Sequence, residues 1–229
     1  PGPGRGAANL SYGNSFNWLI ENTASYSKTF ANHSISALAG YTTQKSKGVG
    51  VSLNAGPYAN DLIQTINAAP GITSWGQSVD TWSMISYLGR LNYSFKDRYL
   101  FTATLRSDGS SRFGTSNRFA LFPSAAVAWK LSDEAFMKAI PVIDHMKLRA
   151  SYGKSGNNNI GNYSHLSNVS MGQYAFNNTT VSTATVSLFN PLLGWEESEQ
   201  IDLGLETALF KGKLSLTADL YHRKSVNML

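Results

Sequence analysis

The sequence predicts an all-β chain that folds as an antiparallel, up-and-down sheet. The first observation is strict two-residue alternation, as in residues 85–93 and again in 99–108. Successive side chains on a strand point to opposite faces, so each such segment is a strand with an apolar face and a more polar one. The second observation is that connections between these segments are alternately very short and long, which places all long connections at the same end of the sheet.

Eight segments show this alternation, and each is expected to be one strand. They are residues 16–29, 34–45, 80–95, 98–108, 118–131, 145–154, 196–210 and 213–225. Tight turns are expected at 31–33, 96–97 and 211–212, and a short helical turn at 135–139. Long connections are expected at 46–79, 109–117 and 155–195, with a helix-like pattern inside the first, at 60–67.

The composition is unusual for a soluble domain and excludes a membrane protein built of helices. The 229 residues carry a net charge of +5, but only 14% of them are charged, and there is no cysteine. A soluble domain normally has about 25% charged residues. No apolar run reaches the ~20 residues of a membrane helix. The modest, dispersed basic charge does not indicate a nucleic-acid partner.

Periodicity alone leaves a soluble β-sandwich and a membrane β-barrel open, because both have one apolar and one polar face. Two details favour the barrel. Several strands are longer than the ~9–11 residues that cross a bilayer. Aromatic residues also gather at the short-turn end, as in the aromatic girdle of a barrel: Tyr26, Phe30, Tyr93, Phe95, Tyr99, Phe101, Trp129 and Phe210.

Candidate functional residues follow from this two-faced pattern. Charged residues on the polar strand faces, or where a strand enters a long connection, are expected to contact the lumen or a loop: Arg90, Arg106, Asp108, Arg112, Arg149, Asp202 and Glu206. For Arg106, Asp108 and Arg112 an Asp/Arg pairing that orders the loop is the favoured interpretation. Aromatic residues of the long connections are candidate extracellular contacts: Trp75, Tyr163, Tyr174, Phe176 and Trp195.

Catalytic, metal and cofactor sites are not indicated. The segment Gly153-Lys154-Ser155 lacks the earlier glycine of a phosphate-binding loop, because residue 148 is leucine. The four histidines have no ligand spacing, and Glu196, Glu197 and Glu199 have no second group at a defined distance. We therefore expect no enzyme activity and no cofactor.

Longer strings of sequence resemble a known family. Residues 92–114 (NYSFKDRYLFTATLRSDGSSRFG), 122–129 (FPSAAVAW) and 148–157 (LRASYGKSGN) resemble the SusC-like (SusC/RagA) TonB-dependent outer-membrane transporters. Residues 190–196 (NPLLGWE), 200–206 (QIDLGLE) and 219–224 (DLYHRK) follow in the order of that family. The resemblance covers residues 14–229.

The resemblance implies a role in nutrient uptake across the outer membrane of a Gram-negative bacterium. Such transporters have a barrel of about 22 strands closed by a plug, and we expect residues 1–229 to be a fragment of that barrel domain without the plug. The implied substrates are oligosaccharides or peptides. The implied partners are membrane lipid, a SusD-like surface lipoprotein, and TonB through the absent plug. The alternative is a small passive porin or structural outer-membrane barrel that is complete in this chain.

Overall fold

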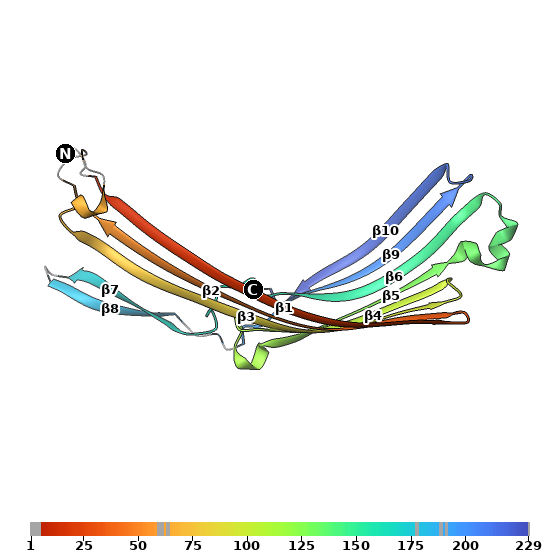
Figure 1. Ribbon diagram of the computed structural model, residues 1–229, viewed down its shortest axis with the longest axis horizontal. Coiled ribbons are helices and arrows are strands. Elements are labelled where there is room, and N and C mark those ends of the chain that lie inside the picture. The colour runs from red at the N-terminus through yellow and green to blue at the C-terminus, as the bar shows by residue number, and fades with distance from the viewer. Residues whose placement is uncertain are drawn as a thin grey trace. The chain divides into compact units, whose positions relative to one another are not determined.

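The computed structural model describes residues 6–58, 62, 65–176, 179–187, 190 and 192–228. In this part of the chain ten strands are present (Figure 1): β1 (Ala8–Phe30), β2 (His33–Ala55), β3 (Ile72–Phe95), β4 (Tyr99–Ser110), β5 (Phe119–Lys130), β6 (Ile143–Asn157), β7 (Asn168–Phe176), β8 (Thr179–Ser187), β9 (Glu196–Leu209) and β10 (Leu214–Val226). Four short 3-10 helices lie in the connections: η1 (Ile66–Ala68), η2 (Thr115–Asn117), η3 (Leu131–Asp133) and η4 (Ala135–Ala139).

Eight of the strands form one sheet in the order β1-β2-β3-β4-β5-β6-β9-β10, and β7 and β8 pair as a separate two-stranded sheet. The pairs from β3 to β10 are antiparallel. The all-β, up-and-down, eight-stranded prediction is therefore confirmed. The sheet is open, with β1 and β10 as its end strands.

The chain divides into two compact units, which are described separately. The first holds Pro1–Leu19 and Gln44–Ser83, and the second holds Ile20–Thr43 and Met84–Leu229. In the first unit, polar side chains join the three strands: Asn9 Nδ2 donates to Asn54 Oδ1 at 2.7 Å, and Asn54 Nδ2 donates to Ser74 Oγ at 2.9 Å. The second unit contains the complete strands β4, β5, β6, β9 and β10, and it carries the candidate site.

The predicted tight turns are present at one end of the second unit. Ala31, Lys96, Asp97, Phe210 and Lys211 have φ between 50° and 57°, and Gly212 has φ of 76°. Two-residue hairpins need such positive φ values because their twist must match the right-handed twist of the strands. The predicted helical turn at 135–139 is also present, as η4.

Two predicted connections are wrong in extent. Strand β2 continues to Ala55 and β3 begins at Ile72, so much of 46–79 is strand. The hairpin β7–β8 lies inside the predicted connection 155–195. In β2, Val49, Val51 and Leu53 do alternate, but Lys45 and Lys47 precede them on the same face and interrupt the apolar pattern. The backbone pairing shows that these segments are strands. Of the helix-like pattern at 60–67, residues 66–67 belong to the 3-10 helix η1, and residues 60, 61, 63 and 64 lie outside the described part.

Candidate functional site

The strand register assigns the side chains of the second unit to two faces. Residues directly opposite each other in an antiparallel pair lie on the same face. One face contains the rows Trp129–Leu148–Leu205–Ala218 and Val127–Ala150–Leu203–Leu220. Its large apolar side chains are exposed, among them Val127, Leu148, Leu203 and Leu220. The other face contains the row Arg149–Gly204–Asp219.

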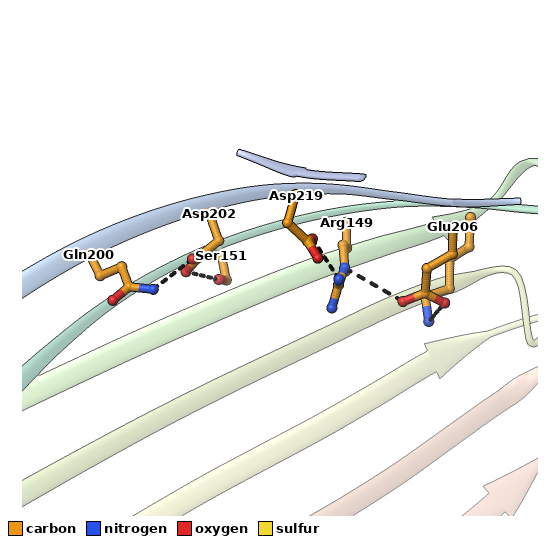
Figure 2. Close-up of polar contacts among 7 residues, drawn as sticks. Arg149, Ser151, Gln200, Asp202, Glu206 and Asp219 are labelled. Atoms are coloured by element: carbon orange, nitrogen blue, oxygen red, sulfur yellow. Dashed lines mark hydrogen bonds and ion pairs between the residues drawn. The ribbon is translucent and has the colours of Figure 1, made fainter. Parts of the chain in front are cut away.

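An alternating charge network joins three strands on the polar face (Figure 2). Arg149 Nη2 lies 2.6 Å from Asp219 Oδ1, and Arg149 Nε lies 3.5 Å from Glu206 Oε1. Lys147 Nζ lies 2.9 Å from the other oxygen of Glu206. The result is a chain of opposite charges, Lys147–Glu206–Arg149–Asp219, that runs across β6, β9 and β10.

Gly204 makes possible the ion pair between Arg149 and Asp219, which crosses β9. It lies on β9 between Arg149 on β6 and Asp219 on β10. A Cβ atom at position 204 would lie 2.7 Å from both Arg149 Cγ and Asp219 Oδ1, closer than real Cβ contacts. The Arg149 side chain therefore crosses β9 through the space that a side chain at 204 would fill.

Asp202 has its own partners on the same face (Figure 2). Ser151 Oγ donates to Oδ2 at 3.0 Å, and Gln200 Nε2 donates to Oδ1 at 2.7 Å. Both carboxylate oxygens thus accept hydrogen bonds from neutral groups. This arrangement orients the carboxylate and keeps its negative charge on the polar face.

A second charged group lies on the polar face of β3 and β4. Arg106 Nε donates to both oxygens of Asp108 at 2.8 Å, and Arg106 Nη2 donates to Ser86 Oγ at 3.2 Å. Ser86 and Asp108 are buried. Arg90 lies nearer the short turns and donates to Thr104 Oγ1 at 3.2 Å. The expected Asp/Arg pairing is present between Arg106 and Asp108.

Arg112 was predicted together with Arg106 and Asp108. It joins the connection after β4 to the connection after β6. Its Nε donates to Asn162 Oδ1 at 2.8 Å and its Nη1 donates to the carbonyl of Asn158 at 3.0 Å. His165 Nδ1 lies 2.9 Å from the carbonyl oxygen of Arg112. Arg112 therefore orders the connection after β6.

Trp195 belongs to a hydrophobic cluster and is only 7% exposed. Its ring lies 5.2 Å from Phe113 and 5.4 Å from Phe122, and its Nε1 donates to the carbonyl of Arg118 at 3.1 Å. The expectation that Trp195 is an external contact is therefore corrected: this ring holds the long connections together.

The other predicted extracellular aromatics have different surroundings. Trp75 lies on β3, not in a connection, and is 80% exposed. Tyr163 lies in the connection after β6, has φ of 66°, and is exposed. Tyr174 and Phe176 lie on β7, and their side chains are outside the described part of the structure.

An aromatic row marks the short-turn end of the apolar face, as predicted. His33 stacks on Phe30 at 5.1 Å and contacts Phe95 at 4.9 Å. The row continues through Tyr99 to Trp129, with 6.2 Å between centroids at each step.

Glu134, in the β5–β6 connection, is bound to the end of this row. Its Oε1 accepts from Tyr99 Oη at 2.7 Å and from Trp129 Nε1 at 3.1 Å, and its Oε2 lies 3.3 Å from Arg98 Nη1. The hydrogen bond from Tyr99, then that from Trp129, holds the pKa of the Glu134 carboxyl below its usual value.

Sequence reasoning missed four residues that build these contacts: Glu134, Lys147, Gly204 and Asp219. Lys147 and Asp219 follow the alternation of the polar face, which was a usable signal. Gly204 stands between Asp202 and Glu206 on that face, where a glycine in a strand indicates close approach by another group. Nothing in the pattern near Glu134 indicates its aromatic partners.

The chemistry available to these residues is charge pairing and hydrogen bonding. Among the described residues, no group of three or more His, Cys, Asp or Glu side chains could hold a metal ion. None of the described helices combines the length and the apolar character needed to cross a membrane.

The antiparallel sheet, with exposed apolar side chains on one face and paired charges on the other, defines a section of β-barrel wall. The chain belongs to the family of TonB dependent receptor-like β-barrels, whose pattern matches residues 3–229.

Relatives and a solved structure agree with this assignment. The chain is 37% identical over 227 residues to TonB-dependent receptor P3 of Formosa agariphila, covering 98% of this chain and 23% of that protein. It is 41% identical over 152 residues to TonB-dependent receptor SusC of Bacteroides thetaiotaomicron, covering 64% of this chain and 15% of that protein. A solved structure of the RagAB peptide transporter matches with a TM-score of 0.86 and 26% identity, over 97% of this chain and 25% of the matched chain. The chain thus spans about a quarter or less of the proteins it matches.

Proposed function

We propose that this chain is a section of the wall of an energy-coupled importer in the outer membrane of a Gram-negative bacterium. In this proposal the apolar face meets lipid and the polar face lines the lumen. The wall contributes rigidity, fixed luminal charges and loop contacts to nutrient uptake.

The observation that carries the proposal is the network Lys147–Glu206–Arg149–Asp219, opposite a face of exposed leucine, valine and aromatic side chains. Charges on a lipid-facing surface are destabilising, whereas a wet lumen accepts them. Pairing also keeps each charge compensated if another part of the protein covers the face.

Partners are proposed from the family. TonB-dependent relatives support coupling to TonB through a plug that this chain does not contain, and we expect the plug to contact Arg90, Arg149, Asp202 and Glu206. A SusD-like lipoprotein is expected at the loop end, with Trp75, Tyr163, Tyr174 and Phe176 as candidate contacts. A peptide substrate has support from the RagAB peptide transporter, and an oligosaccharide from the resemblance to SusC-like proteins.

The test uses the full-length gene in its own bacterium. Cells with the gene deleted, or restored, are grown on a peptide digest or on oligosaccharides as the only carbon source, and uptake is followed with and without a protonophore. We expect deletion to abolish growth on one of these sources, and the protonophore to abolish uptake. Uptake that survives the protonophore would instead support the passive porin.

Two variants and a control test the partner separately. Tyr163→Ala and Trp75→Ala remove exposed aromatic side chains, and Tyr221→Ala removes an exposed aromatic side chain from the polar face of β10. We expect the first two to reduce co-purification of the lipoprotein and the third to leave it unchanged. Equal co-purification in all three would contradict the placement of the partner.

A further inference from the structure

The β5–β6 connection, residues 131–142, differs from the other connections at the short-turn end. Those are tight turns, whereas this one contains η3 and η4 (Figure 1). It exposes three apolar side chains: Phe136 is 59% exposed, Ile140 44% and Val142 43%. Exposed apolar side chains that gather in one connection indicate an interaction site.

Contacts at both ends fix this connection to the wall. At its start, Glu134 is bound by Tyr99 and Trp129, which are the end of the aromatic row on the apolar face. At its end, the N–H of Phe210 donates to the carbonyl of Val142 at 3.0 Å. The connection is therefore held at the border of the face that we place in lipid.

Exposed lysines surround the connection. Lys138 lies on η4, Lys96 in the β3–β4 turn, and Lys211 and Lys213 in the β9–β10 turn. No ion pair between described residues involves any of these four lysines.

The acidic groups of the same turns have donors within the chain. Asp97 accepts from Ser94 Oγ, Asp133 from Ser132 Oγ, and Asp144 from the N–H of Gly212. Because none of the four lysines forms an ion pair with a described residue, they can meet an anionic partner beside the exposed apolar side chains.

We propose that residues 131–142 form an interfacial lipid anchor, in which Phe136 inserts at the level of the aromatic row and Lys138, with Lys211, binds the phosphate of anionic phospholipid headgroups. An apolar side chain flanked by lysines on a short amphipathic segment suits this boundary. The proposal rests on the placement of the apolar face in the membrane.

Spin labels can measure the depth of the anchor in the full-length protein, with any cysteine outside this chain replaced; the chain itself has none. Labels are attached at Phe136→Cys, at Leu203→Cys on the apolar face, and at Asp133→Cys in the same connection. The protein is reconstituted in vesicles of phosphatidylethanolamine and phosphatidylglycerol. Accessibility to oxygen and to a water-soluble nickel complex is then compared at each site.

We expect the label at 203 to be accessible to oxygen, the label at 133 to the nickel complex, and the label at 136 to oxygen at a shallower depth than 203. A nickel-accessible label at 136 with an oxygen-accessible label at 203 would overturn the anchor and leave the wall intact. Nickel access at both sites would overturn the membrane placement and the anchor with it.

Headgroup recognition has its own measurement. Native mass spectrometry of the full-length protein with equal phosphatidylglycerol and phosphatidylcholine should show preferential retention of phosphatidylglycerol. The variant Lys138→Gln/Lys211→Gln should lose at least half of that preference. Lys224→Gln, near the opposite end of β10, is the matched control and should keep it. An unchanged preference in the double variant would overturn the role of these lysines.

Discussion

Arg149 is the central residue of the charge network on the polar face, because it contacts acidic side chains on two other strands. Its side chain is 42% exposed and that of Asp219 is 50% exposed. Water therefore screens this ion pair, and exposed pairs of this kind contribute about 0–1 kcal/mol each. Its role is better described as orientation: Arg149 fixes where two carboxylates lie on the face.

Gly204→Ala tests this dependence. The new methyl group would displace Arg149 from Asp219, while alanine would also remove the ~0.5–1 kcal/mol cost of glycine in a strand. Gly89→Ala is the matched control, because nothing lies within 4 Å of a Cβ there. We expect the Gly204 variant to be about 1 kcal/mol less stable than the Gly89 variant, measured by thermal unfolding of the full-length protein in detergent. Equal stabilities would contradict the argument.

Trp195 provides a second test at this scale. Trp195→Ala should leave a cavity between Phe113 and Phe122 and cost about 3–5 kcal/mol, whereas Trp195→Phe should lose mainly the hydrogen bond to Arg118, worth about 1 kcal/mol. Limited proteolysis of the connections at 111–118 and 192–195 measures the loss of local order. Trp75→Ala, an exposed tryptophan, should change cleavage little; if it changed cleavage as much as Trp195→Ala, burial would not be the cause.

Only some of these residues were predictable. Alternation correctly placed Arg149, Asp202 and Glu206 on one strand face, because face assignment needs only local sequence. Their partners were not predictable, since Arg149 and Asp219 are 70 residues apart and meet only through the register across β9. Trp195 was misread as exposed for the same reason: Phe113 and Phe122 come from distant parts of the chain.

At the scale of elements, β4, β5, β6, β9 and β10 each combine a polar and an apolar surface. The boundaries were predicted best where the apolar face is continuous, as in β5 and β9. They failed in β2, where Lys45 and Lys47 interrupt the apolar face, and in the first residues of β3, where apolar and polar side chains are mixed on both faces. Hydrophobic patterning identifies a strand only where one face is continuously apolar.

Adjacent positions on β5 can test which face meets lipid. Val127 points to the apolar face and Ala126 to the polar one. Val127 lies two residues from the aromatic row, so we expect Val127→Arg to cost about 1–2 kcal/mol, less than a cation at the bilayer midplane, and Ala126→Arg to cost less still. The measurement is the urea midpoint of the full-length protein folded in vesicles. Similar midpoints would contradict a lipid-facing apolar side.

The Glu134 contacts predict a pH dependence for the β5–β6 connection. A carboxyl whose pKa is lowered in the folded protein stabilises it above the ordinary pKa of 4.5, and this contribution is lost as the pH falls through the lowered value. We expect hydrogen exchange at 131–142 to rise selectively below about pH 4.5.

Two variants isolate the carboxyl. Glu134→Gln should remove the acid-dependent step, because the amide does not titrate. Tyr99→Phe removes the largest cause of the lowered pKa, so the acid-dependent step should become smaller and should be complete at a higher pH. An acid-dependent step that persists in Glu134→Gln would assign it to another group.

At the scale of the whole molecule, the sheet has two end strands and a broad apolar face. Strands β1 and β10 each have one neighbour in the sheet. Unpaired strand edges join other chains, and unsatisfied backbone groups are not tolerated in lipid. The described sheet therefore needs further strands to close.

Residues 1–229 expressed alone should consequently aggregate in water, whereas the full-length protein in detergent should be monodisperse. Sedimentation velocity measures both, and the intact denatured mass of the natural polypeptide shows whether it extends beyond residues 1–229. A soluble monomer of 24.9 kDa would contradict the wall assignment and favour a self-contained small barrel.

Gly204 has a consequence for assembly. A slip of β9 by one residue would turn its leucines to the wrong face, but a slip by two would keep every side chain on its own face. A two-residue slip would bring Asp202 or Glu206 opposite Arg149. The side chain of that acidic residue would then block the path from Arg149 to Asp219. Gly204 therefore favours the correct register of β6, β9 and β10 over the two-residue slip, which the hydrophobic pattern alone does not exclude.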